Sequence, residues 1–241
     1  MQKKVGLSNF GEGILVKIVK GEDTKNTEIV WADKGPITLT NGRYHELGPE
    51  TWIVPEYPDH ASYDGAAGRY LNSGFKSSID GYNKKAHMKP YEFGQEIIWA
   101  TPDRIGYIIH VVTIGAPAKK QFETVFKAVF KAISVACDAP FGISHLMTIN
   151  SISMPFDLGA NALTPEQNAQ AIIGAIDSFA RSYGYANVNE VVLCVKGGKS
   201  LKAANKVLTD GSYRDFSHKD GQSFFNPEKW IKKTTGREFW E

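Results

Sequence analysis

Small residues follow an apolar segment at residues 151–162, where the chain could hold a phosphorylated ligand. The segment reads SISMPFDLGANA. Gly159 and Ala160 would let the backbone approach a ligand closely, and free N–H groups in the loop and at the start of the next helix could bind phosphate. An ordinary strand-to-helix turn has a similar composition, and the segment taken alone favours that plainer interpretation.

A second run of small residues, YDGAAGRY at 63–70, predicts a tight loop that opens into a short helix. Asp64 in this run could act as a general base near a ribose, or it could cap the helix, and the residues support both roles equally. The sequence GGKS at 197–200 resembles the end of a P-loop, but the first glycine of that motif would fall on Leu193. We therefore predict a turn and a helix cap there.

Few other side chains suggest chemistry. Phe156 could stack on a base or ribose, although packing beneath the loop is favoured. His45 and His60 are interpreted as solvated loop residues. His87 and His145 lack ligand spacing with cysteines or acidic residues, so no metal site and no cofactor are predicted.

Hydrophobic periodicity indicates the elements that must position these residues. Strands are expected at 14–19, 28–32, 106–113, 147–154 and 190–196, and helices at about 119–137, from Thr164 to near Gly184, and at 201–208. Thr164, Pro165 and Gln167 form an N-terminal capping pattern. The alternation of strands and helices predicts an α/β fold with a mainly parallel sheet, whose ligands bind at the carboxyl ends of the strands.

Composition is that of a folded, water-soluble domain. The 241 residues are 42% hydrophobic and 22% charged, with a net charge of +2 that argues against a nucleic-acid partner. Cys137 and Cys194 are interpreted as small core residues. The N-terminus has no signal-peptide pattern, and the longest apolar run is too short to span a bilayer, so a cytoplasmic location without a membrane partner is expected.

Two regions depart from the alternating pattern. Residues 33–62 contain four prolines and three glycines, which predicts an irregular insertion. Residues 211–241 are polar and aromatic, which predicts a C-terminal extension that packs on the body. The expected organisation is therefore one domain over 1–210, with the insertion at 33–62 and the extension at 211–241.

Together these segments resemble the macrodomain family of ADP-ribose-binding modules, from about residue 14 to residue 208. The likeness rests on GEDT at 21–24, YDGAA at 63–67, YIIHVV at 107–112, SISMPFDLGANA at 151–162 and EVVLCV at 190–195. The resemblance implies a three-layer α/β/α mixed sheet. It also implies two phosphate-binding loops and an acidic contact to adenine from Glu22 or Asp23.

The resemblance places ligand-binding residues in three segments of the chain. They are Glu22, Asp23, Asp64, Gly65, Ala66, Ala67, Phe156, Asp157, Leu158, Gly159, Ala160, Asn161 and Ala162. Hydrolytic members carry asparagines at the end of the second strand, and the sequence comparison puts Trp31 and Lys34 there. We therefore expect a protein that binds ADP-ribose, a related nucleotide or an ADP-ribosylated substrate without that hydrolysis. A hydrolase with relocated catalytic residues, for which Asp64 and Asp157 are candidates, and a protein-interaction module with a degenerate pocket are the alternatives.

Overall fold

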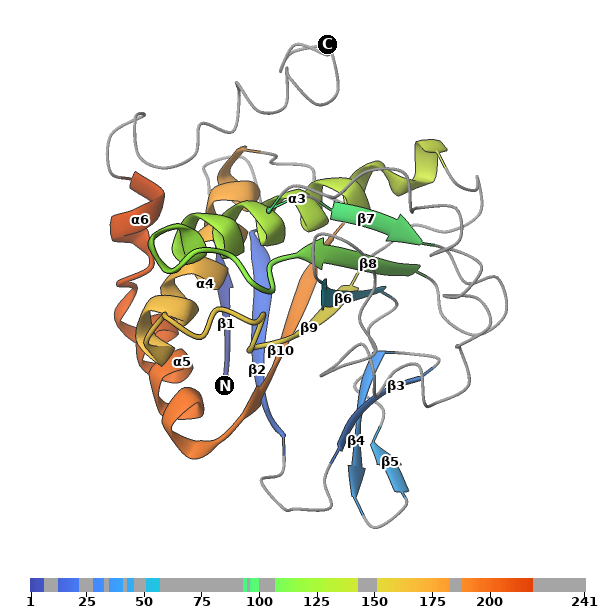
Figure 1. The fold of residues 1–241 in the computed structure, drawn as a ribbon, viewed down its shortest axis with the longest axis horizontal. Helices are drawn as coiled ribbons and strands as arrows, with labels where there is room; N and C mark the ends of the chain where they lie inside the picture. Colours follow the sequence, from blue (N-terminus) through green and yellow to red (C-terminus); the bar gives the residue numbers. More distant parts are fainter. Residues whose placement is uncertain are drawn as a thin grey trace.

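The computed structural model describes residues 1–6, 13–21, 28–32, 35–40, 43–45, 51–56, 93–94, 96–99, 107–142, 151–182 and 188–218. A mixed seven-stranded sheet runs through it in the order β1-β2-β10-β9-β6-β8-β7 (Figure 1). Its strands are β1 (Gln2–Val5), β2 (Ile14–Gly21), β6 (Thr51–Glu56), β7 (Glu96–Trp99), β8 (Tyr107–Val112), β9 (Ser151–Pro155) and β10 (Glu190–Lys196).

The five central strands of this sheet are parallel, and only the edge strands β1 and β7 run antiparallel to their neighbours. The carboxyl ends of β2, β10, β9, β6 and β8 therefore lie along one edge of the sheet. Loops that follow these strands can meet at that edge, as expected for ligand sites in open α/β sheets.

Helices cover one face of the sheet in the described part of the chain. The 3₁₀ turn η2 (Ala118–Lys120) leads into α3 (Gln121–Gly142), and α4 (Pro165–Ser182) lies against α3. The helix α5 (Gly198–Asp210) contributes Ala204, Val207 and Leu208 to the same hydrophobic cluster. The predicted α/β fold with a mixed sheet is thus confirmed, while the second helical layer of the prediction lies outside the described residues.

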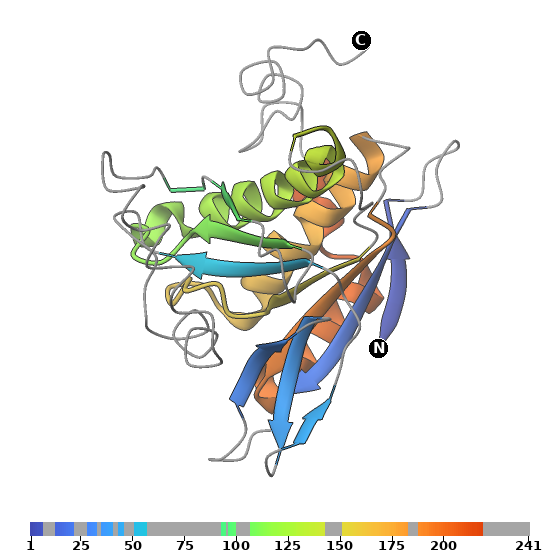
Figure 2. The same cartoon turned by 90° about the vertical axis from the view of Figure 1, so that its right-hand side faces the viewer.

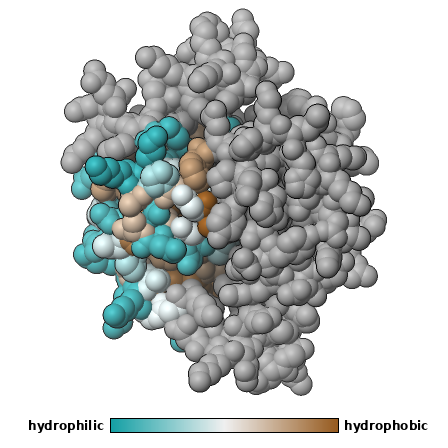
Figure 3. Space-filling view, viewed as in Figure 1, coloured by the Kyte–Doolittle hydropathy of each residue, from teal (hydrophilic) through white to brown (hydrophobic). Residues whose placement is uncertain are grey.

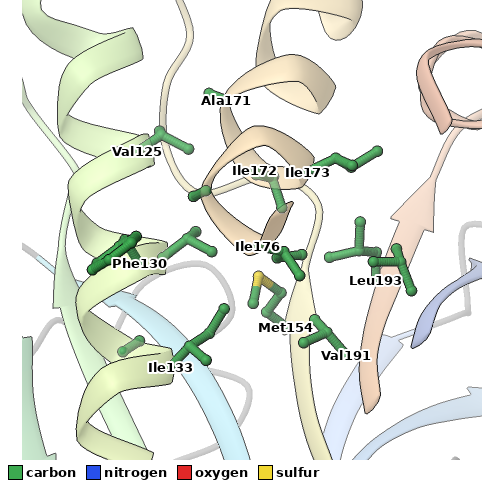
Figure 4. Close-up of a cluster of buried hydrophobic side chains, with 14 of the residues drawn as sticks. Val125, Phe130, Ile133, Met154, Ala171, Ile172, Ile173, Ile176, Val191 and Leu193 are labelled. Carbon is green, nitrogen blue, oxygen red and sulfur yellow. The ribbon is translucent and has the colours of Figure 1, made fainter. Parts of the chain in front are cut away.

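The core fills the space between α3, α4 and the sheet (Figure 4). The apolar stripe predicted for α3 packs inward, since Val125, Val129, Phe130 and Ile133 are completely buried. Ile172, Ile176 and Phe179 of α4 meet them, together with Met154 of β9 and Val191 and Leu193 of β10. Val192 and Cys194 point to the opposite face of β10 and are also buried.

The capping pattern predicted for α4 is present. The backbone N–H of Gln167 donates to Thr164 Oγ1 at 3.2 Å, and the N–H of Thr164 donates to Gln167 Oε1 at 3.0 Å. These two bonds satisfy donors that a helix start leaves open. They also fix the point where the preceding loop ends.

The interpretation of residues 33–62 as irregular is wrong. The segment contains β4 (Gly35–Thr40), β5 (Arg43–His45) and β6, and β6 lies inside the main sheet. Pro55 is tolerated in β6 because the pairing with β9 covers only Thr51 and Trp52. At Pro55 the strand has β8 as its one described neighbour, so the missing N–H breaks no ladder on the other side.

The strand β3 (Glu28–Ala32) pairs with β4, and β4 pairs with β5, in a separate three-stranded antiparallel sheet. In Figure 2 these three strands project from the body beside β2. The chain therefore leaves the main sheet after β2 and re-enters it at β6. Periodicity identified β3 correctly as a strand but could not indicate to which sheet it belongs.

The N-terminal strand β1 was not predicted. It is held to α4 by Asp177, a completely buried carboxylate that accepts the Gly6 N–H at 2.7 Å and the Arg181 Nε–H at 2.8 Å. Gly6 has φ of +70°, and a Cβ there would lie 2.2 Å from Ala180 Cβ. The buried charge is thus paired and hydrogen-bonded, as a carboxylate in a core requires.

The first residues of the predicted C-terminal extension pack on the body. Tyr213 is completely buried, and the short helix α6 (Arg214–His218) lies against α4. Phe216 contacts Phe122 of α3, with ring centroids 4.8 Å apart. Residues 219–241, with most of the aromatic tail, lie outside the described part, and the domain boundaries at 210 and 211 stay a prediction.

The described surface is ordinary. The described residues on the face seen in Figure 3 are a mixture of hydrophilic and hydrophobic residues without a large continuous hydrophobic patch. Met1 and Phe93 are the large hydrophobic side chains exposed among the described residues. No helix in the described ranges is long and apolar enough to cross a bilayer.

Candidate functional site

The β9–α4 loop, residues 156–162, lies at the carboxyl edge of the parallel strands. Its first residue is fixed by two bonds: the Phe156 N–H donates to Cys194 O of β10 at 2.8 Å, and Asn168 Nδ2 donates to Phe156 O at 2.6 Å. The Phe156 side chain is 4% exposed and belongs to the core. The predicted packing role of Phe156 is therefore confirmed, and the Phe156 side chain fixes the start of the loop to the hydrophobic core.

Gly159 lets the middle of the loop lie directly on the turn after β8. Its φ is +78°, a conformation that other L-residues rarely adopt. A Cβ at this position would stand 2.7 Å from Ile114 Cγ1. The glycine is thus required twice, by the backbone conformation and by the contact with Ile114.

Gln121, the first residue of α3, closes the end of the loop. Its side chain is 7% exposed, and Oε1 accepts the Ala162 N–H at 2.7 Å while Nε2 donates to Ala116 O at 3.0 Å. One amide group therefore joins the turn after β8 to the loop after β9. Sequence reasoning missed this residue, because a glutamine at a helix start gives no signal of a partner 41 positions away.

Several N–H groups of this loop have no hydrogen-bond acceptor among the residues that the structure describes. Gly159 donates to Asp157 Oδ1 at 2.9 Å, and Leu163 donates to Ala160 O at 3.1 Å. Within the described part of the chain, the N–H groups of Leu158, Ala160 and Asn161 donate no hydrogen bond. Backbone donors gathered just before a helix N-terminus suit an anion such as phosphate.

The polar side chains of the loop are at the surface. Asp157 and Asn161 are exposed, and Ala162 is exposed as well, whereas Leu158 is completely buried and Ala160 is 8% exposed. The structure thus brings together the predicted residues 156–162 in one short loop.

The remaining predicted site residues lie outside the described part: Glu22, Asp23, Asp64, Gly65, Ala66 and Ala67. Their neighbours in sequence are informative. Gly21, which precedes Glu22, ends β2 opposite Lys196 at the end of β10. The chain enters the segment that contains Asp64 from the carboxyl end of β6. The strands β2 and β6, which precede these residues, therefore end at the same edge of the sheet as β9.

The assignment of Trp31 and Lys34 to the asparagine positions is wrong for Trp31. Trp31 lies in β3, which pairs with β4 in the small sheet and does not belong to the parallel set. The parallel strand that leads toward Asp64 is β6, which ends with Pro55 and Glu56. Neither of these is an asparagine. Lys34 lies outside the described residues.

The turn predicted at GGKS is confirmed as a helix cap. Gly197 is the N-cap of α5, with φ of 89°, and α5 begins at Gly198. Nearby, Cys194 is a free thiol whose burial raises its pKa to about 12. Such a thiol stays protonated and unreactive, which agrees with its interpretation as a core residue.

This arrangement of parallel strands, crossover helices and carboxyl-edge loop is the macrodomain fold, which solved structures share over most of the chain. A mutant of the Oceanobacillus iheyensis macrodomain with ADPR aligns at a TM-score of 0.60 and 14% identity, covering 88% of this chain and 98% of that one. The same macrodomain with ADP aligns at a TM-score of 0.59 and 15% identity, covering 89% of this chain and 97% of that one.

A more distant likeness is to the Trypanosoma brucei macrodomain in complex with ADP-ribose, at a TM-score of 0.51 and 10% identity, covering 66% of this chain and 63% of that one. No family model matches the sequence, and no curated protein matches it. The resemblance drawn from the sequence is thus confirmed at the level of the fold, and the low identities agree with a divergent chain.

Proposed function

We propose that this protein binds ADP-ribose or a related ADP-ribosyl nucleotide at the carboxyl edge of its sheet. The observation that carries the proposal is the β9–α4 loop, where three N–H groups that have no acceptor among the described residues precede a capped helix. Backbone amides in such a position bind the oxygens of a diphosphate. The same fold occurs in macrodomains solved with ADPR, ADP or ADP-ribose.

In this proposal the diphosphate lies between the β9–α4 loop and the segment 63–67, and Glu22 or Asp23 contacts the adenine amino group. The positions of the strand ends support it, because β2, β6 and β9 all end at one edge. The mouth of such a site would be formed by the loops, while the strands below supply a rigid base.

Calorimetry with ADP-ribose, AMP and cyclic ADP-ribose tests the proposal. We expect a micromolar-range dissociation constant for ADP-ribose and weaker binding of AMP, which lacks the second phosphate and the distal ribose. The absence of heat with all three nucleotides would contradict the proposal. It would favour the alternative of a protein-interaction module on the same fold.

We further propose that binding does not lead to the asparagine-dependent hydrolysis of the family. The end of β6 carries Pro55 and Glu56, and neither residue offers the side-chain amide that would orient a water or ribose hydroxyl. The exposed carboxylate of Asp157 keeps relocated catalysis as the competing candidate, because hydrolysis depends on geometry more than on one residue type.

Release of ADP-ribose from mono-ADP-ribosylated protein distinguishes a protein that only binds the nucleotide from a hydrolase with relocated catalytic residues. We expect no release by the wild type under conditions in which it binds ADP-ribose. Release that is abolished by Asp157→Ala or Asp64→Ala would establish a hydrolase with relocated residues and overturn this part of the proposal.

A further inference from the structure

The β9–α4 loop contains a carboxylate side chain that accepts a hydrogen bond from the loop backbone. Asp157 is exposed at the loop surface, and its Oδ1 accepts the Gly159 N–H at 2.9 Å. A carboxylate thus occupies one of the donors that a phosphate oxygen would otherwise use. The second oxygen of Asp157 makes no ion pair or hydrogen bond within the described residues.

The next available donors are close to this carboxylate along the chain. Ala160 and Asn161 follow Gly159 directly, and neighbouring Cα atoms are about 3.8 Å apart. Because Asp157 Oδ1 lies 2.9 Å from the Gly159 nitrogen, a phosphate bound to the next two N–H groups would lie roughly 4–7 Å from the carboxylate. At that distance two charges interact appreciably even in water.

No basic residue of the loop offsets this charge. Residues 151–164 contain neither lysine nor arginine, and the turn at 113–117 contains none. The first basic residues after that turn are Lys119 and Lys120 of η2, both exposed. The charge of the loop itself is therefore negative, although its backbone is built to accept an anion.

We infer that Asp157 determines ligand specificity. It favours a diphosphate that carries a ribose at each end over a diphosphate that ends in a free phosphate. The inference rests on the proposed function, since it concerns the same loop. In ADP-ribose each phosphate carries one ribose ester and shares the bridging anhydride oxygen with the other phosphate, so each carries one negative charge. The terminal phosphate of ADP is bonded only through the anhydride oxygen and has a second ionisation near about pH 6, as phosphate monoesters do, so it carries nearly one charge more at neutral pH.

This extra charge is repelled by Asp157, whereas the N–H donors of the loop serve both ligands alike. A unit charge at about 4 Å in water contributes about 1 kcal/mol, which corresponds to roughly fivefold in affinity. The Asp157 charge should therefore weaken the binding of ADP relative to that of ADP-ribose by about fivefold.

The test compares dissociation constants for ADP-ribose and ADP in the full chain at low salt. Asp157→Asn keeps an oxygen that can accept the Gly159 N–H but removes the charge. We expect it to reduce the ratio of the ADP constant to the ADP-ribose constant by about fivefold, mainly by tightening ADP. Raising the salt concentration should reduce the wild-type ratio in the same direction, because it screens exposed charges.

Two further variants separate charge from loop geometry. Glu190→Gln removes one negative charge at the amino end of β10, the opposite edge of the sheet, and should leave the ratio unchanged. Asp157→Ala removes the charge and also frees the Gly159 N–H, and it should reduce the ratio at least as much as Asp157→Asn does.

The outcomes are distinct. If both ligands bind and Asp157→Asn leaves the ratio unchanged, this inference is overturned while the proposed function stands. A smaller ratio in Asp157→Ala alone would assign the effect to the freed N–H and would also overturn it. If neither nucleotide binds to any variant, the proposed function fails together with the inference.

Discussion

At the scale of single residues, Gly159 is the most constrained position of the candidate site. Its φ of +78° and the contact of its backbone with Ile114 leave no room for a side chain. Gly159→Ala should therefore destabilise the fold by about 1–3 kcal/mol, through the left-handed backbone and the displaced loop. Chemical denaturation measures this change, and calorimetry should show weaker binding of ADP-ribose.

Gly198 provides the matched control for this prediction. It begins α5, and a Cβ added there would meet nothing within 4 Å. Gly198→Ala should leave stability unchanged or raise it by up to about 1 kcal/mol, because alanine favours the helix. Equal effects of the two substitutions would show that the Ile114 contact does not constrain the loop.

Cys194 carries a pH dependence whose sign follows from its burial. The folded protein keeps the thiol proton until the pKa of about 12, whereas the ordinary value is 9.0. Between these values the unfolded state binds fewer protons, so the free energy of unfolding decreases as pH rises. The contribution of Cys194 is complete below about pH 9 and is lost progressively toward pH 12.

Urea denaturation at pH 8 and at pH 10.5 tests this on the wild type and on Cys194→Ala. The variant lacks the thiol but retains Tyr213, whose pKa burial also raises, so the contribution of Tyr213 cancels in the comparison. We expect the wild type to lose more stability than the variant over this interval. Parallel losses in the two proteins would contradict the assignment.

At the scale of elements, Gln121 couples the turn after β8 to the loop after β9. Gln121→Ala removes the partners of both the Ala162 N–H and Ala116 O. The loss of such buried bonds costs about 1–3 kcal/mol. Ala162 is exposed, so protection of its amide against hydrogen exchange depends on this bond and should fall in the variant.

Gln170→Ala is a suitable control, because Gln170 lies in the second turn of α4, away from the Ala162 N–H, and is partly exposed. It should leave the exchange of the Ala162 amide unchanged. If the amide exchanges at the same rate in the wild type and in Gln121→Ala, the loop is held by Gly159 and Phe156 alone. ADP-ribose affinity in the two variants would then show whether the order of the loop matters for binding.

At the scale of the whole molecule, stability depends on the contact between α3, α4 and the sheet. Phe130 and Phe179 are completely buried, and their rings meet edge to face with centroids 5.3 Å apart. Phe179→Ala should cost about 3–5 kcal/mol in the free energy of unfolding. A double-mutant cycle with Phe130→Ala should give a coupling of about 0.5–1.5 kcal/mol.

Phe93→Ala serves as the control for this pair, since Phe93 is 37% exposed. Its substitution should change stability by less than about 0.5 kcal/mol. Comparable losses for Phe93→Ala and Phe179→Ala would mean that the buried cluster does not dominate the stability of the fold.

Local patterns in the sequence determined the elements with strong periodicity and clear caps. The strand at 190–196 and the helix from Thr164 onward are found where they were predicted. The stripe of α3 was identified correctly, although the helix runs to Gly142, beyond the predicted end at Cys137. The loop at 156–162 was predicted as a candidate site because small residues between a strand and a capped helix have a direct physical meaning.

The tertiary structure alone decided how these elements are connected. Pairing partners are chosen by long-range packing, so a β-branched run cannot indicate whether it joins the main sheet, as β6 does, or a separate one, as β3 does. Because β3 joins the separate sheet, Trp31 does not lie at the end of a parallel strand, where the sequence comparison had placed it. The contact of Gly159 with Ile114, the bridge made by Gln121 and the pairing of Asp177 with Gly6 are likewise invisible in sequence, because each joins residues that only the folded chain brings together.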